Sequence, residues 1–219
     1  MKAADPFRRS RAARGEVLYR QGERSSRLYQ AETGLIRLLR TTPRGRTVTL
    51  RHVLPGDYFG EDVLNDLPHS HSAEALTGAS LRLYDVSLLS QEDLLAISRN
   101  LGQQLGRAMS HEVHLQLGDL RHRVVRYLLE LVDTPLGAED TENRLYVRAT
   151  HELLAEGSGS TRESVSKVVT ELRDLGLIET GYRHITLLDL PGLRDLAGSA
   201  LTAGMREGTP PSQRSGAGP

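Results

Sequence analysis

Arg162, Glu163 and Lys167 stand close together in this sequence of 219 residues and share a chemistry suited to reading base pairs. An arginine can donate two hydrogen bonds to O6 and N7 of guanine, and a glutamate beside it can accept one from N4 of cytosine. A lysine one helical turn later can reach a further guanine or a phosphate. The segment therefore carries the groups needed to contact bases in a DNA major groove.

Four nearby residues could add contacts to the DNA backbone. Thr150, Thr161 and Ser164 carry hydroxyl groups near expected helix N-termini, where backbone amides also favour phosphate. His151 follows Thr150 and completes the set of candidate DNA-binding residues. Contacts of this kind position a protein on the duplex, whereas base contacts supply the specificity.

The segment 150–178 predicts two helices joined by a tight turn. Thr150 can cap a first helix over 151–156, and Thr161 can cap a second over 162–175. A helix-turn-helix inserts the N-terminal turns of its second helix into the major groove. An ordinary helical hairpin with solvated charges is the alternative, because acids are at least as numerous as bases here. The buried face of the second helix would hold Val165, Val168, Val169 and Leu172.

The N-terminal part of the chain, from Gly15 to about Asp85, alternates short apolar runs with glycine turns. Short strands spaced about 8 to 12 residues apart predict an all-β barrel or roll. The runs lie at residues 17–19, 28–29, 35–39 and 48–50.

The pattern becomes helical over 88–132, a stretch without proline in which Ser90 and Asp93 form a capping-box start. One small β domain cannot cover the apolar stripe of such a long helix, which favours a parallel pair of helices from two copies of the chain. The alternative is a stripe that packs on the chain's own β domain. The stripe consists of Leu101, Leu105, Met109, Val113, Leu117 and Leu120.

The remaining segments are short or polar. Residues 133–143 contain proline, glycine and several acids and predict a loop, which a strand at 145–147 follows. A hairpin is expected near Gly181. After Ala197 the composition falls to glycine, serine, proline and threonine, which predicts a disordered tail.

The overall composition excludes several kinds of protein. The formal net charge is zero, so affinity for DNA must come from the local placement of cations. The chain has no cysteine, which excludes disulfides, thiolate zinc sites and cysteine-held iron–sulfur clusters. No apolar run reaches the roughly 18 residues of a transmembrane helix, and the basic N-terminus lacks the apolar stretch of a signal peptide. We expect a cytoplasmic protein with no membrane partner.

Two separate motifs resemble those of one known family. Residues 161–167, Thr-Arg-Glu-Ser-Val-Ser-Lys, are similar to the Ser-Arg-Glu-Thr-Val signature of the cyclic-AMP receptor protein and FNR-type (CRP/FNR) regulators. The likeness covers about residues 15–190. The family's β-roll and phosphate cassette are matched, in the same order along the chain, by Gly22-Glu23, Gly34, residues 56–61 and Ser72-Ala73.

The resemblance implies an α+β chain with an N-terminal β-roll like a cyclic-nucleotide-binding domain over 1–89. A long dimerisation helix with a hinge into the next domain would span 90–132, a winged helix-turn-helix 133–197, and the disordered tail 198–219. The resemblance assigns base reading to Arg162, Glu163 and Lys167. It also implies a homodimer on double-stranded DNA, with RNA polymerase as a partner. One departure is Gly157-Ser158, where such regulators usually place apolar residues.

The phosphate cassette departs from that of the cyclic-nucleotide-binding members, which place an arginine before Ser72 to pair with the cyclic phosphate. Here that residue is His71, and no lysine or arginine occurs from 52 to 81. A buried phosphate would lose a charge-assisted pair. On the long helix, Ala108 and Met109 replace the hydroxyl pair that faces adenine. We therefore expect DNA binding without cyclic AMP. If the roll binds any effector, the candidate residues are Gly60, Glu61, His71 and Ser72.

Two histidine pairs have spacings found in metal sites. His69 and His71 could lie on one face of a strand, and His111 and His114 are one helical turn apart. Neither pair has an evident third ligand, so surface or internally satisfied histidines are the preferred interpretation, with no metal and no cofactor. No nucleophile–base constellation or phosphate-cradling loop indicates an enzyme.

Three functions remain open on the sequence. The preferred one is a DNA-binding transcription regulator, an activator, whose dimer needs no small effector and whose activity is set by its abundance. The second keeps this role but has an unidentified ligand in the β-roll as a gate. The third is a cyclic-nucleotide sensor whose winged domain has become a protein-interaction module.

Overall fold

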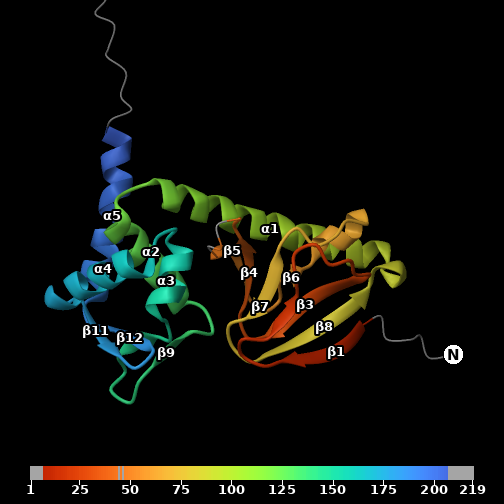
Figure 1. Cartoon of the computed structure of the whole chain (residues 1–219), viewed down its shortest axis with the longest axis horizontal. Coiled ribbons are helices and arrows are strands. Elements are labelled where there is room, and N and C mark those ends of the chain that lie inside the picture. The colour runs from red at the N-terminus through yellow and green to blue at the C-terminus, as the bar shows by residue number, and fades with distance from the viewer. Residues whose placement is uncertain (1–6, 44, 46, 207–219) are drawn as a thin grey trace, which may run out of the picture.

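The computed structural model describes residues 7–43, 45 and 47–206, with side chains up to residue 198. A β-rich N-terminal part and a C-terminal part of helices and short strands lie side by side, and one long helix runs along the first toward the second (Figure 1). No helix in the described ranges is both long and apolar enough to cross a membrane.

The N-terminal part is a β-roll made of two antiparallel four-stranded sheets, as predicted. Ala31 and Phe59 of one sheet and Ile36 of the other are fully buried in a shared core. One sheet has the order β1 (Phe7–Ala12), β8 (Ala79–Asp85), β3 (Arg27–Thr33) and β6 (Tyr58–Phe59). The other has the order β2 (Val17–Tyr19), β7 (Ser72–Ala75), β4 (Ile36–Thr41) and β5 (Thr47–Val53).

Two short 3₁₀ helices complete the roll. The 3₁₀ helix η1 (Glu61–Asn65) follows β6, and η2 (Val86–Leu88) follows β8. Strand β1 was not predicted from the sequence. Four of its six residues are exposed and polar at a sheet edge, so the segment lacks the apolar alternation that indicates a strand.

The long helix α1 (Gln91–Gln116) begins at the predicted capping box, in which Ser90 and Asp93 bond each other's backbone amides. It ends before Gly118, whose φ of +81° is a left-handed conformation suited to glycine. A second helix, α2 (Leu120–Val132), starts there with Asp119 as its N-cap. The stretch 90–132 is therefore two helices separated by a bend, and Leu120 belongs to the second and not to the apolar stripe of the first.

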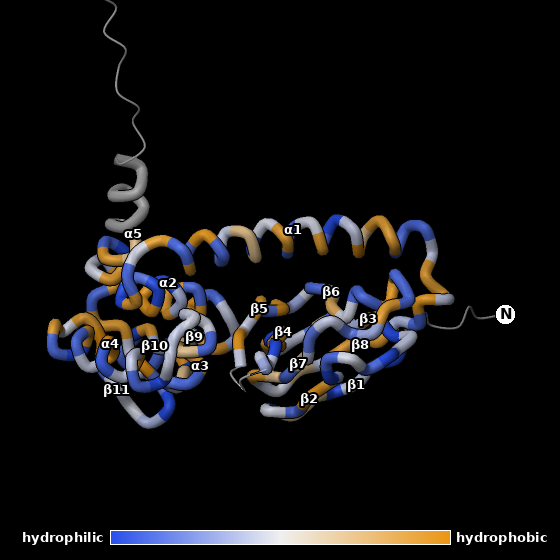
Figure 2. The backbone as a smooth tube through the Cα atoms, turned by 45° about the horizontal axis from the view of Figure 1, so that its top comes forward, coloured by the Kyte–Doolittle hydropathy of each residue, from blue (hydrophilic) through white to orange (hydrophobic). Residues whose placement is uncertain are grey.

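Over its middle turns, the apolar stripe of α1 has no partner among the residues that the structure describes. Leu105, Met109 and Val113 are 60%, 63% and 50% exposed, whereas Leu101 packs on the roll. Figure 2 shows apolar positions recurring along α1 above the roll. The alternative prediction, a stripe packed on the chain's own β domain, applies only to the first turns.

The C-terminal part combines four helices with a small sheet. The sheet has the order β11 (Ile178–Gly181), β12 (His184–Leu187), β10 (Leu145–Val147) and β9 (Gly137–Glu139). With α2, the helices are α3 (His151–Gly157), α4 (Arg162–Asp174) and α5 (Leu190–Arg206). Strand β9 lies in the segment predicted as a loop. Residues 198–206 of the predicted disordered tail are helical, and 207–219 lie outside the described residues.

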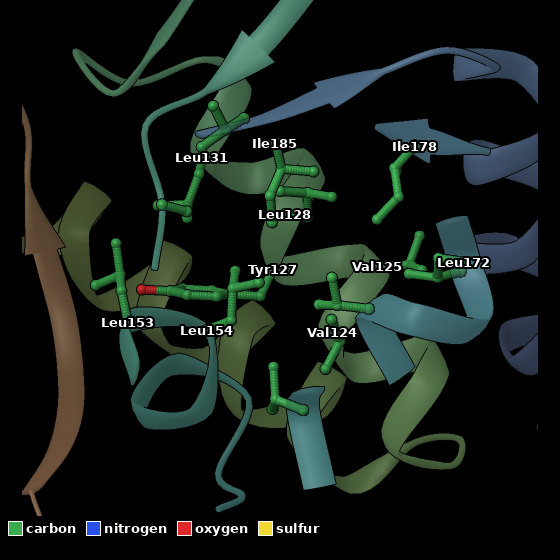
Figure 3. Close-up of a cluster of buried hydrophobic side chains, with 14 of the residues drawn as sticks. Val124, Val125, Tyr127, Leu128, Leu131, Leu153, Leu154, Leu172, Ile178 and Ile185 are labelled. Carbon is green, nitrogen blue, oxygen red and sulfur yellow. The ribbon is translucent and has the colours of Figure 1, made fainter. Parts of the chain in front are cut away.

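One hydrophobic cluster unites this part and extends into the roll. Tyr127 and Leu128 of α2 are buried with side chains of α3, α4, β11 and β12 (Figure 3). Leu35, from the turn between β3 and β4, is fully buried in the same cluster. The core of the C-terminal part therefore continues across the boundary between the two parts.

Candidate nucleic-acid interface

Helix α4 presents the three predicted base-reading residues on its exposed face. Its predicted apolar residues are buried, which turns Arg162, Glu163 and Lys167 toward solvent. Within the described ranges, no hydrogen bond or ion pair engages their side chains. The first two also line a cleft of about 420 Å³ with Thr47 of β5. The N-terminal turns of α4 are thus free to take a partner that offers acceptors and donors.

The hydroxyl residues predicted to contact phosphate cap the two helices. Thr150 Oγ1 accepts from the amide of Leu153 at 3.2 Å, and Thr161 Oγ1 accepts from the amide of Ser164 at 3.3 Å. The Thr161 hydroxyl in turn donates to Ser164 Oγ. His151 is half-buried as the first residue of α3. All four lie at the start of α3 or α4, and the caps bring their polar groups to the helix ends.

The turn between the helices is tightly packed despite its unusual composition. Gly157 lies against the ring of Tyr127, and a Cβ at this position would overlap that ring. Ser158 is fully buried, and its hydroxyl donates to the carbonyl of Leu154 at 2.6 Å. The glycine makes room for the aromatic ring and the serine is satisfied internally, so the departure from the family pattern keeps α3 and α4 firmly on α2.

Contacts between the roll and the C-terminal part fix where α4 lies. The guanidinium of Arg37 on β4 binds Glu74 of β7 at 2.9 Å and also binds Glu156 of α3. His52 Nε2 of β5 lies 3.1 Å from the hydroxyl of Tyr127, with the two rings stacked. Sequence reasoning missed these residues because each pair joins elements far apart along the chain.

The four candidate effector residues meet in the roll, where the side chains of His71 and Ser72 face internal partners. His71 Nε2 lies 3.0 Å from the Tyr19 hydroxyl, and its Nδ1 lies 2.9 Å from Ser70 Oγ. Ser72 Oγ accepts from the amide of Gln21 at 2.9 Å. Gly60 adopts φ +79° under the rings of Tyr19 and Tyr29. The interior around the cassette is filled by side chains of the protein itself.

A cation does reach the cassette, and it comes from β5. Arg51 Nη2 lies 2.6 Å from Glu61 Oε1, whereas the second oxygen of Glu61 is buried and has no hydrogen-bond partner among the described residues. Arg51 stands one position before the stretch 52–81, which contains no lysine or arginine. Strand pairing, which no local motif encodes, brings this arginine to η1. Its charge is already matched by a carboxylate.

The histidines near the cassette are buried and not at the surface as one interpretation held. Burial lowers the pKa of both His69 and His71 below the usual range, despite the nearby carboxylates of Glu61 and Asp62. The His69 ring stacks on Tyr19 with centroids 3.7 Å apart, and neither of its nitrogens has a hydrogen-bond partner in the described part of the chain. His71 is therefore a neutral group where the nucleotide-binding members have a guanidinium.

The second histidine pair has one shared carboxylate. Nδ1 of His111 and Nδ1 of His114 lie 3.1 and 3.0 Å from the two oxygens of Glu130 on α2. These contacts tie α1 to α2 beyond the bend. In the portion of the chain that the structure describes, no three histidine or acidic side chains are arranged to hold a metal ion.

Comparison with known proteins agrees with this architecture. Residues 9–96 match the cyclic nucleotide-binding domain, and residues 122–196 match the Crp-like helix-turn-helix domain. The transcriptional regulator LdrP of Thermus thermophilus is 49% identical over 193 residues, which cover 88% of this chain and 98% of LdrP. The cyclic AMP receptor protein of the same organism is 31% identical over 204 residues, 87% of this chain and 88% of that protein. The crystal structure of TTHB099, a CRP-family transcriptional regulator from Thermus thermophilus, aligns with a TM-score of 0.84 at 48% identity, covering 88% of this chain and 98% of the other.

Proposed function

Because the chain belongs to the CRP/FNR family of DNA-binding transcription regulators, we propose that it binds a palindromic DNA site as a homodimer without cyclic AMP. The observation that carries this proposal is the exposure of Arg162, Glu163 and Lys167 on the N-terminal turns of α4, where their side chains form no hydrogen bond or ion pair with a described residue. Half-sites resembling TGTGA, one helical turn apart, follow from the family signature. Thr150, His151, Thr161 and Ser164 would contact the phosphates beside them.

The exposed stripe of α1 supports the homodimer. Leu105, Met109 and Val113 are each at least half exposed on one face of the helix. A second copy of α1 would cover this face. The two copies of α4 would then be related by a two-fold axis, which matches the symmetry of a palindromic site.

Three features of the roll support independence from cyclic AMP. His71 is neutral and already hydrogen-bonded. Arg51, a cation that reaches the cassette, is paired with Glu61. Leu35 and Arg37 hold the C-terminal part on the roll through contacts of the protein's own side chains. A protein whose DNA-competent orientation is already populated gains little apparent affinity from an effector.

An activator role in the cytoplasm, with RNA polymerase as a partner, is the part of the proposal that the family resemblance alone supports. The activity would then depend on the abundance of the protein. A reporter gene placed under the selected DNA site tests it, since repression by the intact protein would contradict the activator role.

One observation favours a second candidate, in which a ligand bound at the β-roll gates the same DNA role. A cleft of about 810 Å³ lies between β5, α1 and α2. Two buried oxygens on its lining residues, Gln104 Oε1 and Thr49 Oγ1, have no hydrogen-bond partner within the described ranges. A small polar molecule could satisfy them.

The two candidates are separated by titrating a labelled site, chosen by selection from random DNA, with protein shown by mass spectrometry to be empty. We expect tight binding by the empty protein and no change with millimolar cyclic AMP. A tenfold or greater gain on adding the nucleotide would overturn the proposal. Weak binding that a cell extract of small molecules restores would favour the ligand-gated alternative.

A further inference from the structure

Two histidines and one glutamate join α1 to α2 across the bend at Gly118, where the chain turns from one helix into the other (Figure 1). His111 and His114 of α1 place their Nδ1 atoms 3.1 and 3.0 Å from the two oxygens of Glu130 on α2. We call these three residues the hinge cluster. An imidazole binds a carboxylate more strongly when it carries a positive charge. The strength of this tie therefore depends on the protonation of the two rings.

The hinge cluster lies beside the helix-turn-helix. The ring of His111 is 5.9 Å from the ring of Tyr127, measured between centroids. Tyr127 in turn lies against Gly157 at the end of α3 and is buried in the hydrophobic cluster that α2, α3 and α4 share. His111 therefore connects the long helix to the packing that positions α4.

A second tie at the same bend has a fixed charge. Arg126 Nη1 donates to the carbonyl of Leu117 at 3.0 Å, and its Nε donates to the carbonyl of Ala197 on α5 at 2.9 Å. A guanidinium group stays protonated in proteins, whereas histidine gains and loses its proton near neutral pH. The hinge cluster therefore differs from Arg126 in that its charge can change under ordinary conditions.

Solvent can exchange protons with the hinge cluster without unfolding of the chain. The side chains of His114 and Glu130 are 33% and 35% exposed. All three members line the cleft of about 810 Å³ between β5, α1 and α2. Arg51, Arg107 and Asp133 line the same cleft, and the two arginines are paired with carboxylates of the roll.

The groups that face His111 favour its charged form. They are Glu130 and Tyr127 on α2, Glu112 on its own helix and His52 on β5. The hydrogen bond to Glu130 raises the pKa of His111, which burial opposes and Glu112 supports. Burial raises the pKa of Glu130, but the hydrogen bonds from the two histidines lower it overall. Burial also lowers the pKa of His52 to about 4, so this neighbour is neutral near pH 7.

We propose that His111 is a positioning residue for α4, and that the hinge cluster holds the helix-turn-helix on α1 firmly when protonated and less firmly as the pH rises. This inference rests on the proposed function. A histidine whose pKa is raised by folding contributes stability that is complete below its ordinary pKa of about 6.5 and is lost as the pH rises through the raised value. Fewer molecules then hold α4 in place, and the apparent affinity for DNA falls.

The test measures the affinity of the full chain for its selected duplex at about pH 6 and about pH 8.5, on either side of the range in which histidine titrates. The ionic strength is kept constant. His111→Gln and Glu130→Gln are the test variants. The matched control is His122→Gln, because the ring of His122 contacts Asp119 at 2.7 Å at the start of α2 and does not bridge the bend. His151 at the DNA interface is present in every protein compared.

Between the two pH values we expect the wild type and His122→Gln to lose about fivefold in affinity, the difference between a charged and a neutral hydrogen bond. The affinities of His111→Gln and Glu130→Gln should change by less than about twofold, because they lack the titrating pair. The same pH dependence in all four proteins would overturn the proposal. A wild-type affinity that stays constant or rises with pH would also overturn it. Thermal unfolding at the lower pH checks that each variant is folded.

Failure of the proposed function gives a different result. In that case the wild type binds the selected and scrambled duplexes equally at both pH values, and unfolding free energies test the hinge cluster alone. The difference between the wild type and His111→Gln should be larger at the lower pH. A difference that is the same at both pH values would show that the hinge cluster does not respond to protons.

Discussion

The ion pair between Arg37 on β4 and Glu156 on α3 joins the roll to the helix that precedes α4. Both side chains are nearly buried, at 13% and 11% exposure. Burial raises the pKa of Glu156 despite the guanidinium beside it. Burial therefore disfavours the charged form of Glu156, and the positive charge of Arg37 stabilises it.

Arg37→Met should lower the free energy of unfolding by about 3 to 5 kcal/mol, because it leaves Glu74 and Glu156 buried without a cation. Denaturant unfolding measures this loss, and Glu156→Gln in the same chain should recover part of it. DNA affinity should also fall, since fewer molecules hold α4 in place. Tighter DNA binding by the folded variant would mean that the ion pair restrains the DNA-binding part instead.

Gly157→Ala should destabilise the protein by about 1 to 3 kcal/mol or more, because the new methyl group overlaps the ring of Tyr127. In a Tyr127→Leu background the same substitution should cost much less, since the ring is gone. A double-mutant cycle of unfolding free energies measures this coupling. Equal costs in the two backgrounds would contradict the contact.

Stability should depend on His52 in mildly acidic solution. Burial lowers its pKa to about 4, against about 6.5 for an unperturbed histidine. The unfolded chain therefore takes up a proton first, so the stabilisation is complete above pH 6.5 and is lost as the pH falls toward 4. The difference in unfolding free energy between the wild type and His52→Gln should narrow by about 3 kcal/mol over this range. A difference in unfolding free energy that does not change with pH would show that His52 is exposed to solvent in the folded protein.

Leu105→Glu or Val113→Glu should convert a dimer into a monomer, because each puts a charge in the middle of the exposed stripe of α1. Light scattering at micromolar concentration measures the mass. Leu67→Glu is the matched control, since Leu67 is 53% exposed but lies outside α1. A monomer mass for the unmodified protein would remove the basis of the homodimer.

Arg162→Ala should cost about 1 to 3 kcal/mol of binding free energy on the selected site and relax the preference for one guanine. Thr161→Ala should instead weaken every sequence alike, because it removes the cap of α4, worth about 1 kcal/mol. Titration of the selected and scrambled duplexes measures both. Equal losses on the two duplexes for Arg162→Ala would show that it contacts phosphate and not a base.

Local signals in the sequence predicted the helix-turn-helix well, because its caps at Thr150 and Thr161 and its apolar face lie within a few residues of one another. The bend between α1 and α2 also had a local signal, a glycine followed by the N-cap Asp119, which the run of apolar residues obscured. Arg51 and Arg37 could not be assigned in this way. Their partners come from strands and helices far along the chain, and only the pairing of those elements brings the charges together.

Leu35 couples the unfolding of the roll to the unfolding of the C-terminal part. Its side chain belongs to the roll by sequence but is fully buried in the cluster formed by α2, α3 and α4. Opening the C-terminal part would strip this leucine of its neighbours and expose apolar surface on the roll as well. The boundary between the roll and the C-terminal part is therefore a division along the chain, and we expect the two parts to unfold together as one cooperative unit.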